Sequence, residues 1–162
     1  MAVTASVQEF LRRANVGYTV FPHAPAFTAR EEASVTHTSG WRWAKSVICF
    51  IDGEPAQAVV PAHYVVNLDR LATVAGADSI RMAQESELRW LFPDCEPGAM
   101  PPFGPLYKQR VFLDASLALE PTIAFNGGTH QDAIRMRTED FMIVAHPVIG
   151  RFGEPLVQGL VT

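Results

Sequence analysis

The sequence has few cysteines, no long apolar run and no excess of positive charge. Its 162 residues contain only Cys49 and Cys95, too few for a disulfide framework, which favours a reducing compartment such as the cytoplasm. No run of about 18 apolar residues could cross a membrane, and the N-terminus lacks the basic and then apolar pattern of a signal peptide. The formal net charge of -4 argues against a broad electrostatic surface for nucleic acid. We therefore expect a cytoplasmic protein without a membrane segment, in which any nucleic-acid contact is local.

Several familiar catalytic patterns are also missing. The chain has no Gly-x-Ser-x-Gly elbow, no phosphate loop ending in Gly-Lys-Ser/Thr and no dinucleotide fingerprint. Its histidines do not stand at metal-ligand spacing with cysteines or carboxylates, so we predict neither a metal nor a cofactor. Nothing beside Cys95 in the sequence would activate a thiolate, which favours a structural role for that residue.

The remaining pattern predicts one α+β domain over residues 1–162. With 48% hydrophobic residues, the chain is long enough to bury a sizeable core. Helical spacing and capping residues predict helices at 3–15, 28–38, 67–75, 84–91 and 138–145. Apolar runs and turn residues predict strands at 18–21, 45–51, 57–61, 80–82, 110–114, 122–125 and 129–136. Because helices and strands mix without regular alternation, we expect a mixed, mostly antiparallel sheet, and a loosely structured tail over 147–162.

The stretch Asp94–Gly104 stands out between two ordered regions. Its three prolines cannot donate hydrogen bonds to a strand or helix. Gly98 and Gly104 permit backbone angles, and a close approach by a ligand, that other residues resist. A stiff loop of this kind can present backbone N–H groups to a ligand, although a plain connection between a helix and a strand is an equal alternative.

Two polar side chains could face a pocket. Lys45 stands at the entry of the apolar strand 45–51, where it either extends to water or holds a fixed ammonium at a pocket rim. His130 follows Gly127 and Gly128, which we interpret as a turn together with Asn126. It could be a solvated turn residue or could face the same cavity as the proline-glycine loop.

A third group is aromatic. Trp41 and Trp43 flank Arg42, and such a group can stack on a base or on adenosine. Packing in the core or at its rim is the alternative. From these residues alone, the chain is an α+β domain with a pocket, and no reaction can be named.

Three segments, taken in order, carry a resemblance to a known family. They are Ala44-Lys45-Ser46-Val47, then Gly98-Ala99-Met100-Pro101-Pro102 with Phe103-Gly104, and then Phe112-Leu113-Asp114 through Phe125-Asn126-Gly127-Gly128 to His130 and Ile134-Arg135-Met136. In this order the chain resembles the YbaK/EbsC family, the free-standing relatives of the editing domain of bacterial prolyl-tRNA synthetases. The resemblance extends from about Val7 to Ala145. The segment Gly40–Trp43 matches no signature of the family and could line the specificity pocket.

The resemblance implies both a fold and an activity. Family members are compact α+β domains with a barrel-like mixed sheet and flanking helices, and they hydrolyse the ester that joins a wrong amino acid to the terminal adenosine of tRNA. An activated ester needs little acid or base power, so orientation, a positioned water and backbone N–H groups can suffice. The implied partner is the acceptor end of a mischarged tRNA, with a synthetase or elongation factor as a possible helper.

The resemblance also implies site residues, which are assigned here by position. The catalytic set is Lys45, Gly98 and His130, and the substrate-binding set is Ala99, Met100, Pro101, Pro102, Gly127 and Gly128. The amino acid removed stays open among alanine, cysteine, serine and other small residues. A non-catalytic domain that binds a nucleotide or small ligand in the same pocket is the main alternative, and a hydrolase of other esters or amides is the second.

Overall fold

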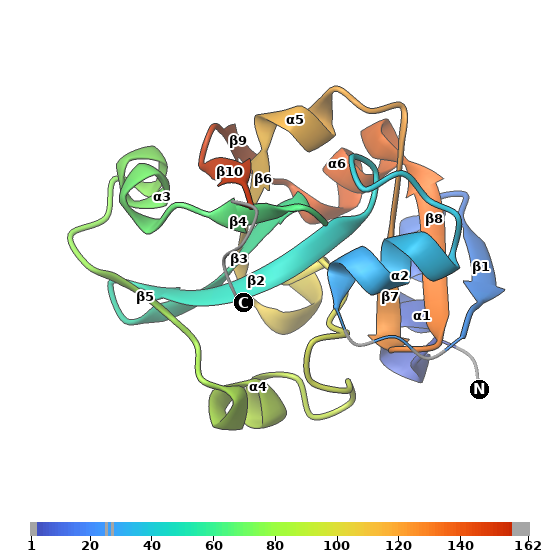
Figure 1. Ribbon diagram of the computed structural model, residues 1–162. Helices are drawn as coiled ribbons and strands as arrows, with labels where there is room; N and C mark the ends of the chain where they lie inside the picture. The colour runs from blue at the N-terminus through green and yellow to red at the C-terminus, as the bar shows by residue number, and fades with distance from the viewer. Residues whose placement is uncertain (1–2, 25, 27, 157–162) are drawn as a thin grey trace.

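The computed structural model describes residues 3–24, 26 and 28–156. In this part of the chain, short helices flank three sheets (Figure 1). The helices are α1 (Ala5–Ala14), α2 (Ala29–Val35), α3 (Leu68–Ala75), α4 (Glu85–Leu91), the 3-10 helix η1 (Gly104–Tyr107), α5 (Ala115–Ala118) and α6 (Thr138–Ala145). The strands are β1 (Thr19–Pro22), β2 (Ala44–Ile51), β3 (Glu54–Pro61), β4 (Tyr64–Val66), β5 (Ile80–Met82), β6 (Arg110–Asp114), β7 (Thr122–Thr129), β8 (Asp132–Arg137), β9 (Val148–Gly150) and β10 (Gly153–Pro155).

The largest sheet has the strand order β5-β2-β3-β6-β9. Strand β2 is antiparallel to β3 and β5, whereas β3–β6 and β6–β9 are parallel pairs. A second sheet, β1-β8-β7, is antiparallel, and β4 pairs with β10. The prediction of an α+β fold with mixed sheets is therefore confirmed.

The barrel-like closure implied by the resemblance is wrong for this chain. Strands β2 and β7 approach each other at a single bridge between Trp43 and Ala124, where the Ala124 N–H donates to the Arg42 carbonyl oxygen at 2.9 Å. Beyond this bridge the two strands are not paired, and residues of α2 and of the Gly98–Met100 loop occupy the opening. The sheets therefore remain open where β2 and β7 diverge.

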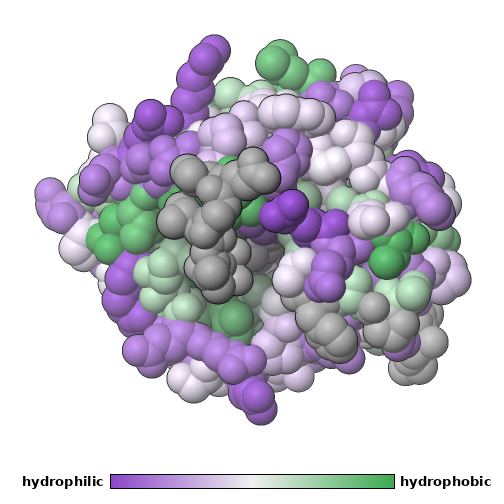
Figure 2. Space-filling view, in the orientation of Figure 1, coloured by the Kyte–Doolittle hydropathy of each residue, from purple (hydrophilic) through white to green (hydrophobic). Residues whose placement is uncertain are grey.

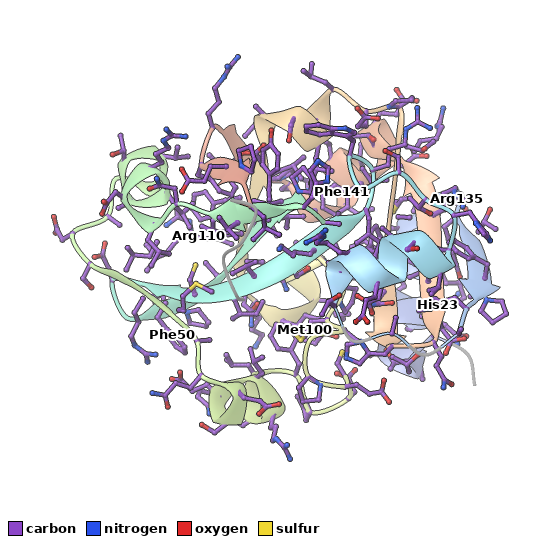
Figure 3. All side chains as sticks on the ribbon, viewed as in Figure 1. His23, Phe50, Met100, Arg110, Arg135 and Phe141 are labelled. Atoms are coloured by element: carbon purple, nitrogen blue, oxygen red, sulfur yellow. The ribbon has the colours of Figure 1, made fainter. Side chains whose placement is uncertain are left out.

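The main core lies between α1, α6 and the sheets. Phe103, Phe125 and Phe141 are fully buried, and the Phe103 and Phe125 rings meet edge to face with centroids 5.2 Å apart. Phe141 comes from α6 (Figure 3). Val7 and Leu11, one helical turn apart, bury one face of α1 against this cluster. Full burial of such side chains stabilises the fold by about 1.5–3 kcal/mol each.

Local signals behave as the sequence predicts. The Thr28 hydroxyl accepts a hydrogen bond from the Glu31 N–H at 3.1 Å, so α2 begins at its expected cap. The Asp52-Gly53 turn has φ values of 49° and 85°, the left-handed pair that closes a tight hairpin. Gly76 ends α3 in the same left-handed region.

The predicted turn at Asn126-Gly127-Gly128 is wrong. Strand β7 continues through these residues to Thr129, with an irregular register after Asn126, and the turn lies at His130-Gln131. Instead, the two glycines allow the N-terminal segment to pack closely against β7. A Cβ on Gly127 would lie 2.7 Å from the Val3 side chain, and the Gly127 carbonyl oxygen accepts a hydrogen bond from the Thr4 N–H.

The prediction of a loosely structured tail is wrong for Val148–Pro155. These residues form β9 and β10, and Phe152 between them is fully buried. The Asp114 carboxylate accepts hydrogen bonds from the N–H groups of Phe152 and Gly153, at 3.2 and 2.7 Å, which fixes the segment against β6. Residues 157–162 lie outside the described residues. No helix in the described part of the chain is long and apolar enough to cross a membrane.

Candidate active site at the opening between β2 and β7

A cleft of about 200 Å³ lies at the opening between β2 and β7. It is lined by four segments, which are the start of β2 with the residue before it, α2, the loop between α4 and η1, and, through Asn126, β7. Its lining residues are Ala29, Glu32, Trp43, Ala44, Lys45, Ser46, Val47, Gly98, Met100 and Asn126. The cleft therefore collects residues from segments far apart in the sequence, including the predicted site residues Lys45, Gly98 and Met100.

The start of β2 offers unpaired main chain to this cleft. Strand β5 pairs only with Cys49–Ile51, and the Ile48 carbonyl oxygen accepts from the Ala83 N–H on the same side. Main-chain groups two residues apart point the same way in a strand. The N–H and C=O of Ser46 therefore face the open edge of β2. The Ser46 hydroxyl is also buried and lacks a hydrogen-bond partner within the described residues.

Lys45 supplies a cation at the cleft. Its side chain is half-buried, and its Nζ lies 3.5 Å from the Ala62 carbonyl oxygen. Burial lowers the pKa of this ammonium, and the nearby positive charge of Arg30 lowers it further. No carboxylate of the described residues forms an ion pair with Lys45. Because this charge has no counterion in the described structure, it can attract a phosphate or stabilise a developing oxyanion.

The proline-glycine loop is held rigidly against β7. The Glu96 N–H donates to the Gly128 carbonyl oxygen at 2.8 Å, and the Gly128 N–H donates to the Ala99 carbonyl oxygen at 3.0 Å. Gly98 has a φ of 87°, in the region that favours glycine. Among the described residues, its N–H donates to the Met100 sulfur alone, at 3.1 Å, and thioether sulfur is a weak acceptor. A stronger acceptor from a ligand can therefore take this N–H.

Of the six predicted substrate-binding residues, one lines the cleft and five lie behind its surface. Met100 lines the cleft and lies on the side of β2 that faces α4 (Figure 3). The remaining five do not line it and are buried, namely Ala99, Pro101, Pro102, Gly127 and Gly128. In this structure they support the loop rather than form its surface.

His130 joins the loop to α2. Its Nδ1 lies 2.9 Å from the Glu32 carboxylate and its Nε2 lies 2.8 Å from the Pro97 carbonyl oxygen. Both partners are acceptors, so both ring nitrogens act as donors when the ring is an imidazolium. The bond to Glu32 raises the pKa of His130, against the effect of burial, and the Pro97 carbonyl adds to the rise. The solvated-turn alternative is wrong, because His130 is buried, and its ring bonds to Glu32 of the cleft lining without lining the cleft itself.

Three polar residues of the cleft lining were not predicted as site residues, namely Glu32, Ser46 and Asn126. The Glu32 carboxylate also accepts a hydrogen bond from the Asn126 amide, and Asn126 in turn lies 3.3 Å from His23 Nε2. The signal for Glu32 is its place beside Ala33 on the buried face of α2, where a carboxylate requires a partner. Asn126 and Ser46 carry no comparable signal, because both fit a turn or a strand without any further role.

Comparison with known proteins identifies the domain. Residues 23–143, most of the chain and the whole lining of the cleft, match the family described as the aminoacyl-tRNA editing domain. The chain belongs to this family. The predicted family and the predicted class of activity, aminoacyl-tRNA deacylation, are confirmed.

Individual relatives of this editing domain are distant in sequence. The Multifunctional Ser/Thr-tRNA deacylase ProXp-y of Escherichia coli (strain K12) is 24% identical over 147 residues, which cover 88% of this chain and 87% of that protein. A crystal structure described as a proposed trans-editing enzyme for prolyl tRNA synthetase has a TM-score of 0.80, at 21% identity, and covers 92% of this chain and 95% of that one. The hypothetical protein APE2540 has a TM-score of 0.81, at 18% identity, with coverage of 92% and 99%. The two structures share the fold of this editing domain.

No side chain lining the cleft of this editing domain is an activated nucleophile. Cys95 lies outside the lining, 3.2 Å from the Tyr107 hydroxyl, and burial raises the pKa of its thiol to about 12. The structure thus agrees with a structural role for Cys95. Within the described residues, no group of three or more histidine, cysteine or acidic side chains could hold a metal ion.

Replacing Gly98 by alanine tests whether the loop conformation matters for the editing domain. The positive φ would cost an alanine about 1–2 kcal/mol, and its Cβ would lie 3.3 Å from His130 Cε1. Because the loop must shift to relieve this contact, we expect kcat/KM for deacylation to fall at least about 10-fold. Steady-state deacylation and urea unfolding measure the two effects.

Gly53 provides a matched control for Gly98. It has nearly the same φ, 85°, in the β2–β3 hairpin, and a Cβ there would meet nothing within 4 Å. Gly53→Ala should therefore lose similar stability and keep its deacylation rate. Equal activity of the two variants would refute a role for the Gly98 loop in the reaction.

Proposed function

We propose that the cleft binds the aminoacylated terminal adenosine of a mischarged tRNA and hydrolyses its ester with a water that the cleft orients. One observation carries this proposal. Lys45, a cation that forms no ion pair with the described carboxylates, lies together with the glycine loop Gly98–Met100 in one cleft of an editing domain. The cleft lining lacks an activated nucleophile, and hydrolysis by a positioned water needs none.

The geometry of the cleft supports a role for each of these groups. The Lys45 ammonium faces the carbonyl oxygen of the ester, or the phosphate of the terminal nucleotide, both of which carry or develop negative charge. The Gly98 N–H exchanges its weak sulfur acceptor for the same carbonyl oxygen. Lys45 and the Gly98 N–H then act as an oxyanion site. The His130–Glu32 pair holds the loop in place and is a positioning element rather than a proton acceptor.

The reaction balances without a covalent intermediate on the protein. The oxygen of water forms a bond to the carbonyl carbon, and the carbonyl oxygen takes up the negative charge of the tetrahedral intermediate. Collapse of that intermediate breaks the bond between the carbonyl carbon and the ribose oxygen. The proton released by the attacking water ends on the ribose hydroxyl, so the products are the free amino acid and uncharged tRNA.

The cleft favours a small amino acid. Its volume of about 200 Å³ must also admit the ester group, and Ala29, Ala44 and Met100 are among its apolar lining. The name of the Escherichia coli relative points in the same direction, so seryl and threonyl esters are the first candidates, with alanyl and cysteinyl esters beside them.

A deacylation panel tests the proposal. Wild-type protein is incubated with aminoacylated tRNAs that carry serine, threonine, alanine, cysteine or proline. Each amino acid is attached once to its cognate tRNA and once to a non-cognate tRNA, and the loss of the aminoacyl ester is followed. We expect one or a few mischarged esters with small side chains to be hydrolysed, and the correctly charged tRNAs to persist. If the protein hydrolyses no ester but binds a nucleotide or small ligand in the cleft, the non-catalytic alternative holds.

We also propose that a synthetase or an elongation factor helps to deliver the tRNA. The support is the net charge of -4, which is unfavourable for holding a whole tRNA through its phosphates. Adding the purified synthetase that makes the charging error should lower KM for the mischarged tRNA. An unchanged KM with every such partner would argue for independent binding. The predicted cytoplasmic location fits a tRNA substrate and stays a prediction.

A further inference from the structure

Three aromatic rings form a partly exposed cluster next to the cleft. Trp41 packs at near right angles against His63 and Tyr64, with ring centroids 4.3 and 5.5 Å apart, and His63 and Tyr64 meet each other at 5.5 Å. Despite these contacts, 48% of the Trp41 surface is exposed. The other tryptophan of the segment, Trp43, is only 1% exposed and belongs to the core. Of the two tryptophans considered for stacking, Trp43 is a buried part of the cleft wall, and Trp41 is the one that offers exposed ring surface outside the cleft.

The cluster is continuous with the cleft. The Lys45 ammonium donates to the Ala62 carbonyl oxygen, and the next residue along the chain is His63. The Gly40 carbonyl oxygen accepts from the Ala62 N–H at 3.1 Å, which brings the Trp41 segment to the same place. A hollow lined by Arg30, Gly40, Ala62 and His63 lies against α2 on this route. A chain that leaves the cleft past Lys45 therefore reaches Trp41 directly.

The route is positively charged although the protein is acidic. Arg30 lines the same hollow as His63, and the Lys45 Nζ lies 3.5 Å from the carbonyl oxygen of Ala62, the residue before His63. Partial burial lowers the pKa of His63, and the positive charges of Arg30 and Lys45 lower it further. Neither forms an ion pair with a carboxylate of the described residues. The face in Figure 2 shows hydrophobic residues in separate small groups among hydrophilic ones, and thus no broad apolar patch in its described part for a protein partner.

From this arrangement we infer a second binding site for the substrate. The Trp41–His63–Tyr64 cluster is a stacking platform for the unpaired nucleotides that precede the terminal adenosine of tRNA, with Arg30 contacting the phosphate between platform and cleft. This inference rests on the proposed function, because the terminal adenosine must lie in the cleft for the preceding nucleotides to reach the platform. Single-stranded nucleic acid is bound in this way, through aromatic rings for the bases and cations for the backbone. The small, local site also fits the absence of a broad basic surface.

The test compares a long and a short substrate in Trp41→Ala. On mischarged tRNA, we expect KM to rise about 10-fold, within the range that one stacked base contributes. On the same amino acid esterified to adenosine alone, which does not reach the platform, kcat/KM should stay unchanged. Trp41→Phe keeps a ring and should recover most of the loss. Trp90→Ala is the matched control, because Trp90 is 65% exposed on α4 and lines neither the cleft nor the hollow.

Equal effects on both substrates, or no effect on tRNA, would overturn the inference. A binding measurement distinguishes failure of the platform inference from failure of the proposed deacylase function. A fluorescently labelled RNA oligonucleotide that ends in CCA is titrated with wild-type protein and with each variant, and its anisotropy is followed without any hydrolysis. Weaker binding by Trp41→Ala than by Trp90→Ala supports the platform even if no ester is hydrolysed. Equal binding by the two variants contradicts it even if deacylation is established.

Discussion

Replacing Lys45 by methionine is expected to lower kcat/KM for deacylation about 100- to 1,000-fold. Methionine keeps most of the apolar stem and removes the ammonium, so the change isolates the charge. A fixed donor at a developing oxyanion, in a site sheltered from water, typically contributes that much to the rate. Because burial and Arg30 already lower the pKa of the Lys45 ammonium, the variant should be as stable as the wild type, or more so. Single-turnover deacylation and urea unfolding give the two values.

The sequence offers a matched control for this variant. The chain has only two lysines, and Lys108 is exposed and lies outside the cleft lining. Lys108→Met removes the same charge from the whole protein and should retain the wild-type rate. If both variants lose the same activity, net charge rather than the cleft explains the loss. If neither loses activity, Lys45 is not part of the site.

The second large effect is on stability. Replacing His130 by asparagine is expected to lower the free energy of unfolding by about 3 kcal/mol. The ring is buried, and it bonds both the Glu32 carboxylate on α2 and the Pro97 carbonyl oxygen of the loop. Its loss leaves Glu32 buried with Asn126 as its remaining side-chain partner. Urea unfolding of the variant and of the wild type measures the difference.

The same pair predicts a pH dependence of stability. The pKa of His130 is raised in the folded state, mainly by the hydrogen bond to Glu32. Its contribution to stability is therefore fully present below the unfolded value of about 6.5 and is lost as the pH rises through the raised folded pKa. We expect the wild type to lose stability over this interval above about pH 6.5, and His130→Asn to lack that part of the pH dependence.

Two further variants make the His130 experiment decisive. His37 is exposed, so His37→Asn should change neither stability nor its pH profile appreciably. Glu32→Gln keeps the shape of the side chain but removes its charge, and should weaken the pH dependence with His130 still present. A pH profile in His130→Asn that matches the wild type would show that another group titrates in this range.

Much of the fold was predictable because its signals are local. The Thr28 cap, the Asp52-Gly53 hairpin and the Gly76 stop each act through backbone groups within a few residues. The prediction failed at Gly127 and Gly128, where two glycines permit a tight turn and a close approach equally well. Only the position of the N-terminal segment, which packs on these glycines, distinguishes the two.

The candidate site also contains residues that were predictable from local sequence and residues that were not. Lys45 and Gly98 were predicted because a lysine at the entry of an apolar strand and a glycine between prolines are unusual locally, and because their order resembles a family. Glu32 lies 98 positions from His130 along the chain, and no local rule joins them. The role of His130 as the residue that ties the loop to α2 could therefore not be derived before the fold was known.

The sequence by itself determined the class of fold, most of the helices and strands and the family, and it pointed to a glycine loop and a lysine that line one cleft. Each of these depends on residue type, short spacing or order along the chain. The tertiary structure decided that the sheets stay open between β2 and β7, that Glu32, Ser46 and Asn126 line the opening, and that Trp41 is exposed while Trp43 is buried. These properties depend on how segments that are distant along the chain pack together. Such packing produces no periodic pattern in the sequence of either segment, so the sequence alone does not reveal it.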